Sequence, residues 1–249
     1  MKKPLIRLFN TAASYIPILE GQVPAELTDK TPVALSANSP EHALYKLHNA
    51  LQEAYPEAGA PYWRVRSWGL VCWQPIYLAL ICVYQLKNVP LNLQALTQSQ
   101  QATMVAGYQL PEGQWQEGDK EGLIAVICQQ LSVFFTEFEE VHRDLFGGRS
   151  VLYQTLLADQ LLASLIVAGQ LFSEFNTAEI SAEFQHWAKA LKLPLTPLKG
   201  FQNNAPAQPI FVRQTCCLHF RRSDGELCSN CPRLQEKQAR VYKKRQLSA

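Results

Sequence analysis

Four of the seven cysteines of this 249-residue chain lie close together near its C-terminal end. They form two pairs, Cys216 with Cys217 and Cys228 with Cys231, separated by ten residues. The stretch 223–226 (Ser-Asp-Gly-Glu) is typical of a hairpin turn, because Gly and Asp tolerate positive φ. A chain that turns back there must bring the two pairs side by side, so we expect this segment to fold around four converging thiols.

The N-terminus bears on the redox state of these thiols. Residues 1–15 begin like a secretory signal, but Arg7 and Asn10 interrupt the apolar run before it is long enough. We therefore expect a cytoplasmic protein, in which cysteines stay reduced. In that compartment a tight cysteine set indicates metal or redox chemistry rather than disulfide bonds.

Four converging thiolates suit either zinc or an iron–sulfur cluster. Zinc sites usually combine two Cys-x-x-Cys turns, and the adjacent Cys216 and Cys217 fit that pattern poorly, because neighbouring side chains of an extended backbone point in opposite directions. A two-iron cluster spreads its ligands over more space, which favours [2Fe-2S], although a bent backbone would also permit zinc. His219 alone cannot supply the two histidines of a Rieske centre, so we expect it to lie beside the cysteines without being a ligand.

The pattern Cys-Cys-x10-Cys-x2-Cys resembles the C-terminal signature of FhuF-like ferric siderophore reductases. Arg213 before the first pair and Leu218 after it also resemble the flanks of that signature. The resemblance implies that the four cysteines bind a [2Fe-2S] cluster, which reduces Fe(III) held by siderophores, often hydroxamates, in the cytoplasm. It is specific over the cysteine segment. Over residues 1–200 it rests on length and helix layout, and it assigns no residue there.

The remaining sequence predicts an α+β protein that is predominantly α-helical. Hydrophobic residues make up 47% of the chain and charged residues 18%, which is enough to build a globular core. We expect a mainly helical, substrate-binding body over residues 1–200 and a C-terminal iron–sulfur segment with a basic tail over 201–249. The apolar stretches 69–84 and 161–169 are interpreted as buried helices, because the first contains Gln and Pro and the second is too short to span a bilayer.

Hydrophobic periodicity, caps and turn residues predict the elements of the body. The expected helices cover 40–55, 62–87, 121–145, 150–172 and 177–193, and one or two β-hairpins lie within 89–118. The expected C-terminal elements are a proline-rich linker over 194–209, a strand over 210–220 and a basic helix from about Leu234.

Charge is unevenly distributed. Residues 210–249 contain nine Lys or Arg and three Asp or Glu, a balance of +6, whereas the rest of the chain has a balance of −4. The basic run at the end consists of Arg233, Lys237, Arg240, Lys243, Lys244 and Arg245. Such a run is most often a solvated face; its functional alternatives are docking of an acidic electron donor, attraction of anionic siderophores, or peripheral contact with anionic lipid of the inner membrane.

Two expectations about partners rest on motifs that the sequence lacks. It has no Gly-rich dinucleotide fingerprint, so electrons must come from a protein such as a ferredoxin or a flavoprotein. No nucleic-acid-binding module accompanies the basic residues, and we expect no nucleic-acid partner.

Aromatic and basic residues gather where the second helix begins. Arg64, Arg66 and Trp68 are candidate residues for binding an anionic iron chelate, together with Trp63 and Trp73. The alternative, which the sequence favours, is a packed helix start whose arginines extend to solvent. The other three cysteines, Cys72, Cys82 and Cys128, lie on apolar helical stretches and are expected to behave as small buried hydrophobes.

Together with the cysteine segment, the resemblance to FhuF-like reductases implies a cytoplasmic ferric-siderophore reductase, an enzyme with no catalytic residues beyond its cluster. Fe(III) is a hard cation that anionic oxygen ligands hold tightly, and Fe(II) binds the same ligands more weakly, so one electron releases the metal. Two alternatives remain open at this point: a zinc-stabilised binding module with a basic tail, and a cluster-bearing redox sensor without turnover.

Overall fold

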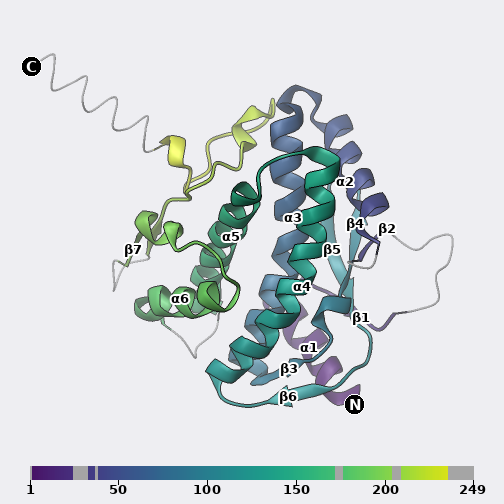
Figure 1. Cartoon of the computed structure of the whole chain (residues 1–249), viewed down its shortest axis with the longest axis vertical. Coiled ribbons are helices and arrows are strands. Elements are labelled where there is room, and N and C mark those ends of the chain that lie inside the picture. The colour runs from purple at the N-terminus through teal and green to yellow at the C-terminus, as the bar shows by residue number, and fades with distance from the viewer. Residues whose placement is uncertain (1, 25–32, 37–38, 172–175, 204–208, 235–249) are drawn as a thin grey trace, which may run out of the picture.

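Helix α3 (Gly59–Ile81) is the element around which the other helices are packed (Figure 1). It is apolar on all sides, and its buried residues follow one another around the whole circumference rather than along one stripe. The computed structural model describes residues 2–24, 33–36, 39–171, 176–203 and 209–234. Its fold is predominantly α-helical with small sheets, as the sequence predicted.

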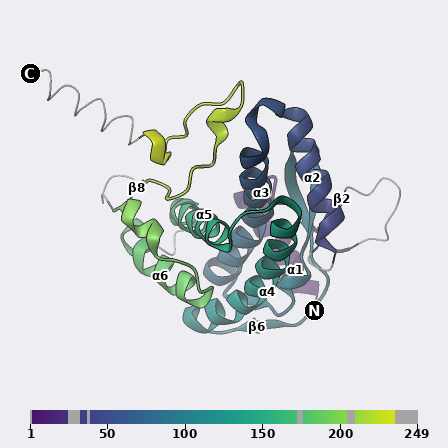
Figure 2. The ribbon, with the colours of Figure 1, turned by 45° about the horizontal axis from the view of Figure 1, so that its top comes forward.

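The helices predicted for the body are all present. α2 (Pro40–Ala54), α4 (Lys120–Phe146) and α5 (Ser150–Leu171) pack on α3, and α6 (Ile180–Ala190) packs on α4 and α5. α1 (Lys2–Tyr15) also contacts α3. Figure 2 shows α2 and α4 on one side of α3 and α5 on another, with α6 outside α5.

Both ends of the long apolar helix have a local cause. Pro75 lies inside α3, and the chain continues beyond Ile81 as a π-helical stretch, η2 (Cys82–Leu86). Lys87 then takes up a left-handed backbone with φ of 51°, which ends the helix. At the other end the short 3₁₀ turn η1 (Pro56–Ala58) links α2 to α3.

The predicted hairpin region forms two small sheets. β4 (Thr97–Gln101) and β5 (Met104–Gln109) make an antiparallel hairpin, which β1 (Gly21–Gln22) and β2 (Val33–Ser36) extend in the order β1-β5-β4-β2. β3 (Asn88–Pro90) pairs with β6 (Trp115–Glu117), and the short turn η3 (Leu93–Ala95) follows β3. Only tertiary contact explains β1 and β2, which the local sequence did not indicate.

Buried glutamine side chains and the partly buried indole of Trp73 join the larger sheet to α3. The amide of Gln74 donates a 3.0 Å hydrogen bond to Gln98, and Gln98 donates one of 2.9 Å to the carbonyl of Val71. The indole of Trp73 donates a 2.8 Å hydrogen bond to the carbonyl of Val105. These bonds satisfy polar groups that would otherwise be costly to bury, and they fix the sheet beside the middle of α3.

Three helical stretches are long and apolar enough to cross a membrane by length and composition: Pro56–Leu86, Lys120–Phe146 and Ser150–Leu171. The stretches 69–84 and 161–169, predicted to be buried, belong to the first and third of them. In the structure 78% of the apolar window of the first and 56% of that of the third are buried within the protein. Packing against the rest of the chain is therefore one physical reason for their composition.

The C-terminal region departs from the prediction. The expected linker contains the 3₁₀ turn η5 (Thr196–Gly200), and β7 (Phe201–Gln202) pairs with β8 (Ile210–Phe211). The strand expected over 210–220 therefore ends at Phe211 in the described chain. The short 3₁₀ turns η4 (Thr177–Glu179) and η6 (His219–Arg221) complete the described elements. The basic helix predicted from Leu234 falls almost wholly on residues 235–249, outside the described residues.

Candidate metal centre

The cysteine segment, residues 213–233, lies at the upper left of the helical body in Figures 1 and 2, between α5 and the upper end of α3, and is closed by backbone hydrogen bonds. The N–H of Arg213 donates a 3.0 Å bond to the carbonyl of Asn230, which joins the two arms of the segment next to the cysteines. The N–H of Cys231 donates one of 3.0 Å to the carbonyl of Cys228, which forms the tight turn of the second pair. The two cysteine pairs are thus brought together, as the spacing predicted.

The thiols of the first cysteine pair lie beside those of the second. The sulfur atoms of Cys217 and Cys228 are 3.6 Å apart. The Cys216 thiol interacts with Cys231 and Cys217, and the Cys228 thiol interacts with Cys217 and Cys231. Cys231 is buried, with 2% of its surface exposed, while the other three are partly exposed. The donor set therefore lies at the surface with one member in the interior.

The backbone bends directly after the two adjacent cysteines. Leu218, directly after the first pair, has a left-handed backbone with φ of 58°, a conformation that L-residues other than Gly adopt at a cost. The N–H of Leu218 donates a 3.4 Å hydrogen bond to the sulfur of Cys216. Hydrogen bonds of this kind to cysteine sulfur tune metal clusters. The strain at Leu218 thus lies at the functional site itself.

The loop between the pairs is not the predicted two-stranded hairpin. After Leu218 it forms η6, and the N–H of Gly225 then donates a 3.1 Å bond to the carbonyl of Arg222. The turn is therefore centred one residue earlier than expected. A side chain on Gly225 would put its Cβ 2.0 Å from the carbonyl oxygen of His219, so the close approach of two backbones requires glycine there. His219, expected on a strand, begins the η6 turn.

The same loop is docked on the corner between α2 and α3. The guanidinium of Arg222 lies 3.9 Å from the ring centre of Tyr55, and its Nε donates a 2.7 Å bond to Asp224. The N–H of Ser223 donates a 2.7 Å bond to the carboxylate of Glu57, and Arg221 donates a 3.2 Å bond to the carbonyl of Ala58. The helical body thus holds the loop from one side.

The arm that leads into the first pair is held by a buried carboxylate of α5. Asp159 is fully buried, and its two oxygens accept hydrogen bonds from the backbone N–H groups of Gln214, at 3.0 Å, and Thr215, at 2.8 Å. The Nε atom of Arg213 lies 3.9 Å from the same carboxylate. Burial raises the pKa of Asp159, while these backbone hydrogen bonds and Arg213 act in the opposite direction.

The electrostatics of the thiols fit a metal centre. Burial, reinforced by Cys217 and Cys231, raises the pKa of Cys228 to about 12, and burial raises the pKa of Cys216 as well. Four thiolates in one place repel each other and need a cationic group between them, which is the condition under which thiols give up their protons to a metal. The donor set, its convergence and its bent backbone fit a [2Fe-2S] cluster held by Cys216, Cys217, Cys228 and Cys231.

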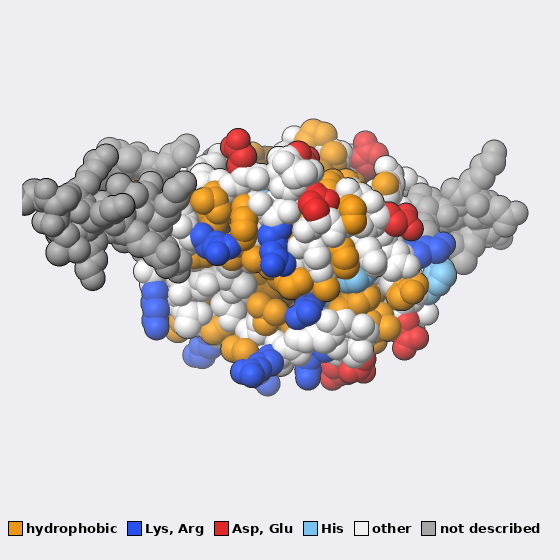
Figure 3. All heavy atoms as spheres, turned by 90° about the horizontal axis from the view of Figure 1, so that it is seen from above, with side chains coloured by type: hydrophobic (Ala, Val, Ile, Leu, Met, Phe, Trp, Pro, Cys, Tyr) orange, Lys and Arg blue, Asp and Glu red, His pale blue; other side chains and the backbone are white. Residues whose placement is uncertain are grey.

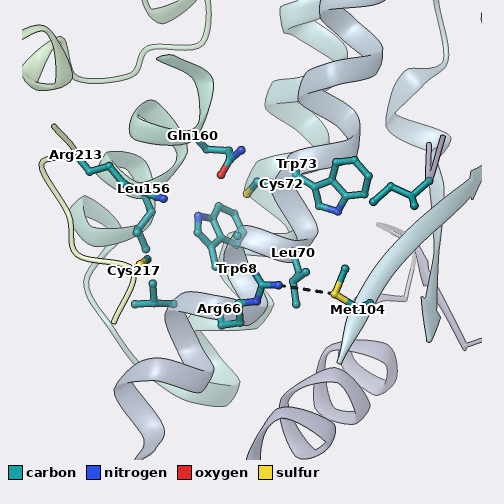
Figure 4. A pocket seen from close by; sticks show the side chains of 13 residues that line it. Arg66, Trp68, Leu70, Cys72, Trp73, Met104, Leu156, Gln160, Arg213 and Cys217 are labelled. Carbon is teal, nitrogen blue, oxygen red and sulfur yellow. Dashed lines mark hydrogen bonds between the residues drawn. The ribbon is translucent and has the colours of Figure 1, made fainter. Parts of the chain in front are cut away.

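An open cavity of about 280 Å³ adjoins this donor set (Figure 4). Its wall includes Cys217 and Arg213 of the cysteine segment, and Arg66 and Trp68 of α3. Figure 4 shows Trp68 at the centre, with Arg213, Leu156 and Cys217 on one side and Cys72 and Trp73 on the other. Gln160 of α5 adds a polar side chain to the wall, and Met104 of β5 adds a thioether. The cavity therefore combines a cluster cysteine, two cations and aromatic surface.

The predicted substrate-binding residues separate into two groups. Arg66 and Trp68 line the cavity, and Arg66 also contacts the sulfur of Met104 at 3.9 Å. Trp68 is buried and donates a 3.2 Å bond to the carbonyl of Tyr153, so it is a packed wall of the cavity rather than a mobile contact. Arg64 is not part of this wall, and its side chain lies near Gly148 instead. Role assignments for all three remain predictions.

The other tryptophans and cysteines lie in packed surroundings. Trp73 borders the cavity while its indole is bonded to β5, and Trp63 donates a 2.8 Å bond to the carbonyl of Tyr55. Cys72, Cys82 and Cys128 are buried, and burial raises the pKa of each thiol. Cys72 also borders the cavity, which the sequence did not indicate.

Sequence reasoning missed Asp159 and Gln160, although one signal was present. Asp159 is the one charged residue in the 22-residue sequence of α5. A lone acid in an apolar helix is rarely buried without a partner, so its position marks a specific contact. Which segment supplies that partner depends on how residues 213–215 pass α5, and the local sequence contains no information on that path.

Comparison with known families agrees with the assignment of the cysteine segment. Residues 213–233 match the family described as the FhuF 2Fe-2S C-terminal domain, and the four cysteines fit its Cys-Cys-x10-Cys-x2-Cys pattern. The segment is therefore a [2Fe-2S] segment, which distinguishes it from the zinc alternative. No solved structure gives a significant match to the chain. Although the four cysteine thiols are brought together, no group of three or more His, Cys, Asp or Glu side chains among the described residues has the spacing required to hold a metal ion.

Proposed function

We propose that this protein is a cytoplasmic oxidoreductase that reduces Fe(III) in siderophore complexes, with a [2Fe-2S] cluster as its electron carrier. One observation carries the proposal: Cys217, a predicted cluster ligand, lines an open cavity together with Arg66 and Arg213. A substrate in that cavity touches the residue that holds the electron carrier. The family match of residues 213–233 supports the same class of reaction.

The chain's own residues provide three functions at this place. When bound, a [2Fe-2S] cluster accepts one electron and gives it up again. The partial exposure of Cys216, Cys217 and Cys228 keeps the donor set within reach of both a redox partner and a substrate. The helical body supplies most of the cavity wall, and the docked loop between the cysteine pairs keeps the cysteines beside the cavity.

The cavity fits part of an anionic, oxygen-rich chelate. Arg66 and Arg213 supply positive charge, and the amide of Gln160 can donate or accept a hydrogen bond. A volume of about 280 Å³ lies just below the usual range for small-molecule sites, so it accommodates one arm or face of a hexadentate siderophore while the remainder stays outside. Hydroxamate chelates have the required oxygen donors and are the substrates that we propose.

The reaction is balanced by one external electron. A donor protein supplies the electron, the Fe(III) chelate becomes an Fe(II) chelate, and the weaker Fe(II)–oxygen bonds release the metal; the siderophore itself is neither oxidised nor reduced. The exposed Arg221 and Arg233 lie on the cysteine segment, and we propose that an acidic ferredoxin or flavoprotein docks on this side. Figure 3 shows Lys and Arg side chains set among hydrophobic ones on this upper face, with most acidic side chains nearer its rim.

A stopped-flow experiment tests the proposal. The anaerobic protein is reduced with dithionite, freed of excess reductant and mixed with a ferric trihydroxamate, while visible absorption follows reoxidation and an Fe(II)-specific chelator follows release. We expect one Fe(II) released for each electron that the protein loses. Reoxidation without Fe(II) release would favour the redox-sensor alternative, and an unreactive reduced protein would refute the reductase function.

Arg66→Ala and Arg64→Ala form a matched pair for the cavity. The two arginines stand on the same turn of α3, but only Arg66 lines the cavity. We expect Arg66→Ala to slow reoxidation by an anionic chelate about tenfold and to weaken its salt dependence, because a partly exposed cation acts through screened attraction. Arg64→Ala should retain the wild-type rate. An equal loss in both variants would show that the cavity is not the binding site.

A further inference from the structure

Asp159 is buried among apolar residues, where the loss of water around its carboxylate must be compensated by other interactions. None of its surface is exposed, and Ala158, Leu161 and Leu162 beside it on α5 are buried apolar residues. An ionised carboxylate in such a place costs free energy unless hydrogen bonds and counter-charge replace its water. The residues that provide this compensation belong to one short stretch of chain.

That stretch is 213–215, which directly precedes the first cysteine pair. Each carboxylate oxygen of Asp159 accepts one backbone N–H, from Gln214 and Thr215, and Arg213 supplies the nearby positive charge. Both oxygens therefore act as acceptors, which is the arrangement suited to the ionised form. The backbone N–H of Arg213 donates to Asn230 in the second arm. Asp159 is thus connected through three consecutive residues to both cysteine pairs.

We propose that Asp159 is a positioning residue for the cluster: it fixes the backbone of residues 213–215, and through them it sets Cys216 and Cys217 opposite Cys231 and Cys228. Its negative charge lies against residues 213–215, directly before the first cysteine pair, and favours the oxidised cluster. The proposal concerns the cofactor, so it does not depend on which substrate is reduced.

The contacts explain why a neutral side chain cannot replace the carboxylate. Asparagine has one acceptor oxygen, so one of the N–H groups of Gln214 and Thr215 would face an NH₂ group instead. Arg213, whose side chain is only 17% exposed and whose Nε has no hydrogen-bond partner, would lose its counter-charge. The arm before Cys216 would then be held less tightly, although the four cysteines would all remain.

The test compares Asp159→Asn with Glu183→Gln in the full-length holoprotein. Glu183 is a matched control because it is also a buried helical carboxylate, but its partners are Tyr84 and Lys120, which lie outside the cysteine segment. Three quantities are measured: the rate at which an iron chelator removes the cluster, the midpoint potential, and the visible circular dichroism of the cluster. The last two report the surroundings of the cluster and do not respond to a general loss of stability.

We expect Asp159→Asn to lose its cluster roughly tenfold to a hundredfold faster, the size of effect that follows from one charged hydrogen bond. Its midpoint potential should rise, because a negative charge near the cluster has been removed, and its circular dichroism should change. Glu183→Gln should match the wild type in all three. Wild-type potential and dichroism in Asp159→Asn, or equal changes in both variants, would overturn the proposal.

A measurement on the unmodified protein decides the matter if Asp159→Asn does not fold. Amide hydrogen exchange of Gln214 and Thr215 should be slow, although the segment is irregular and the side chain of Gln214 is exposed. Exchange of these two amides at the rate of free peptide amides would refute the hydrogen bonds on which the positioning role rests.

Discussion

The carboxylate of Asp159, in the middle of α5, accepts a 2.8 Å hydrogen bond from the backbone N–H of Thr215, the residue before Cys216. The two residues are 56 positions apart in the chain. A boundary near residue 200, as the sequence suggested, therefore separates two parts that are bonded to each other through a buried charge. On the opposite side, Tyr55, Glu57 and Ala58 hold the loop between the cysteine pairs.

The four converging cysteines predict the effect of serine substitutions. Cys216→Ser, Cys217→Ser, Cys228→Ser and Cys231→Ser should each lose most of the bound iron and sulfide, because a hydroxyl replaces one of four thiolate ligands. Metal and sulfide analysis of anaerobically purified protein measures this. Cys128→Ala, which changes a buried cysteine on α4, should keep its iron. A serine variant with full iron content and full Fe(II) release would contradict the ligand assignment.

Gly225 predicts a steric effect within the loop. Gly225→Ala places a Cβ 2.0 Å from the carbonyl oxygen of His219, so the backbone must shift at a cost of about 1–3 kcal/mol. We expect lower iron occupancy and a lower unfolding temperature. Gly118→Ala is the matched control, because its nearest atoms, in Leu123, would be at 3.8 Å. Equal unfolding temperatures for the two variants would mean that the loop adapts without strain.

Arg222 predicts how firmly the loop is docked. Arg222→Ala removes the contact with the ring of Tyr55, worth about 0.5–1 kcal/mol, together with the contact to Asp224. The cluster should consequently be lost to a chelator a few-fold faster, with the initial iron content unchanged. Arg149→Ala, at an exposed position between α4 and α5, provides the comparison. Identical rates of cluster loss in both variants would remove the docking role.

The buried His142 leads us to expect that the free energy of unfolding depends on pH, independently of the cluster. It is fully buried between Ser67, at 2.8 Å, and the hydroxyl of Tyr153, at 2.9 Å, and burial lowers its pKa to about 3. In the unfolded chain its pKa is about 6.5, so the unfolded state binds more protons below that value. Stability from this residue is complete above pH 6.5 and falls between about pH 6.5 and pH 3, by at most about 1.4 kcal/mol per pH unit.

The thermal unfolding midpoint between pH 7.5 and pH 5.5 measures this effect, because carboxylates contribute little in that range. The midpoint of the wild type should fall as the pH decreases, and the midpoint of His142→Gln should fall less. His186→Gln, which changes an exposed histidine of α6, should follow the wild type. A wild-type slope in His142→Gln would show that the buried histidine is not responsible.

Local sequence was sufficient wherever one segment determines its own structure. Pro40 and the periodicity after it predicted α2, the periodicity over 121–145 predicted α4, and the polar run between α3 and α4 forms the β4–β5 hairpin. The same holds for the cysteine segment, because cysteine spacing alone predicted that the two pairs meet. The predicted hairpin between the pairs failed because the strained bend at Leu218 and the η6 turn replace strand pairing there.

The sequence by itself thus determined a helical protein in which four cysteines converge, because hydrophobic periodicity and cysteine spacing are local properties, and the resemblance of the cysteine motif to FhuF-like reductases implied the [2Fe-2S] cluster. Only the tertiary structure decided that Asp159 of α5 holds the arm before Cys216, and that Arg66 of α3 shares a cavity with Cys217. Both relationships join residues more than fifty positions apart, and packing of helices around α3 creates them. The role of a charged residue such as Asp159 or Arg66 depends on which segment packs beside it. The course of that segment is fixed when the core forms.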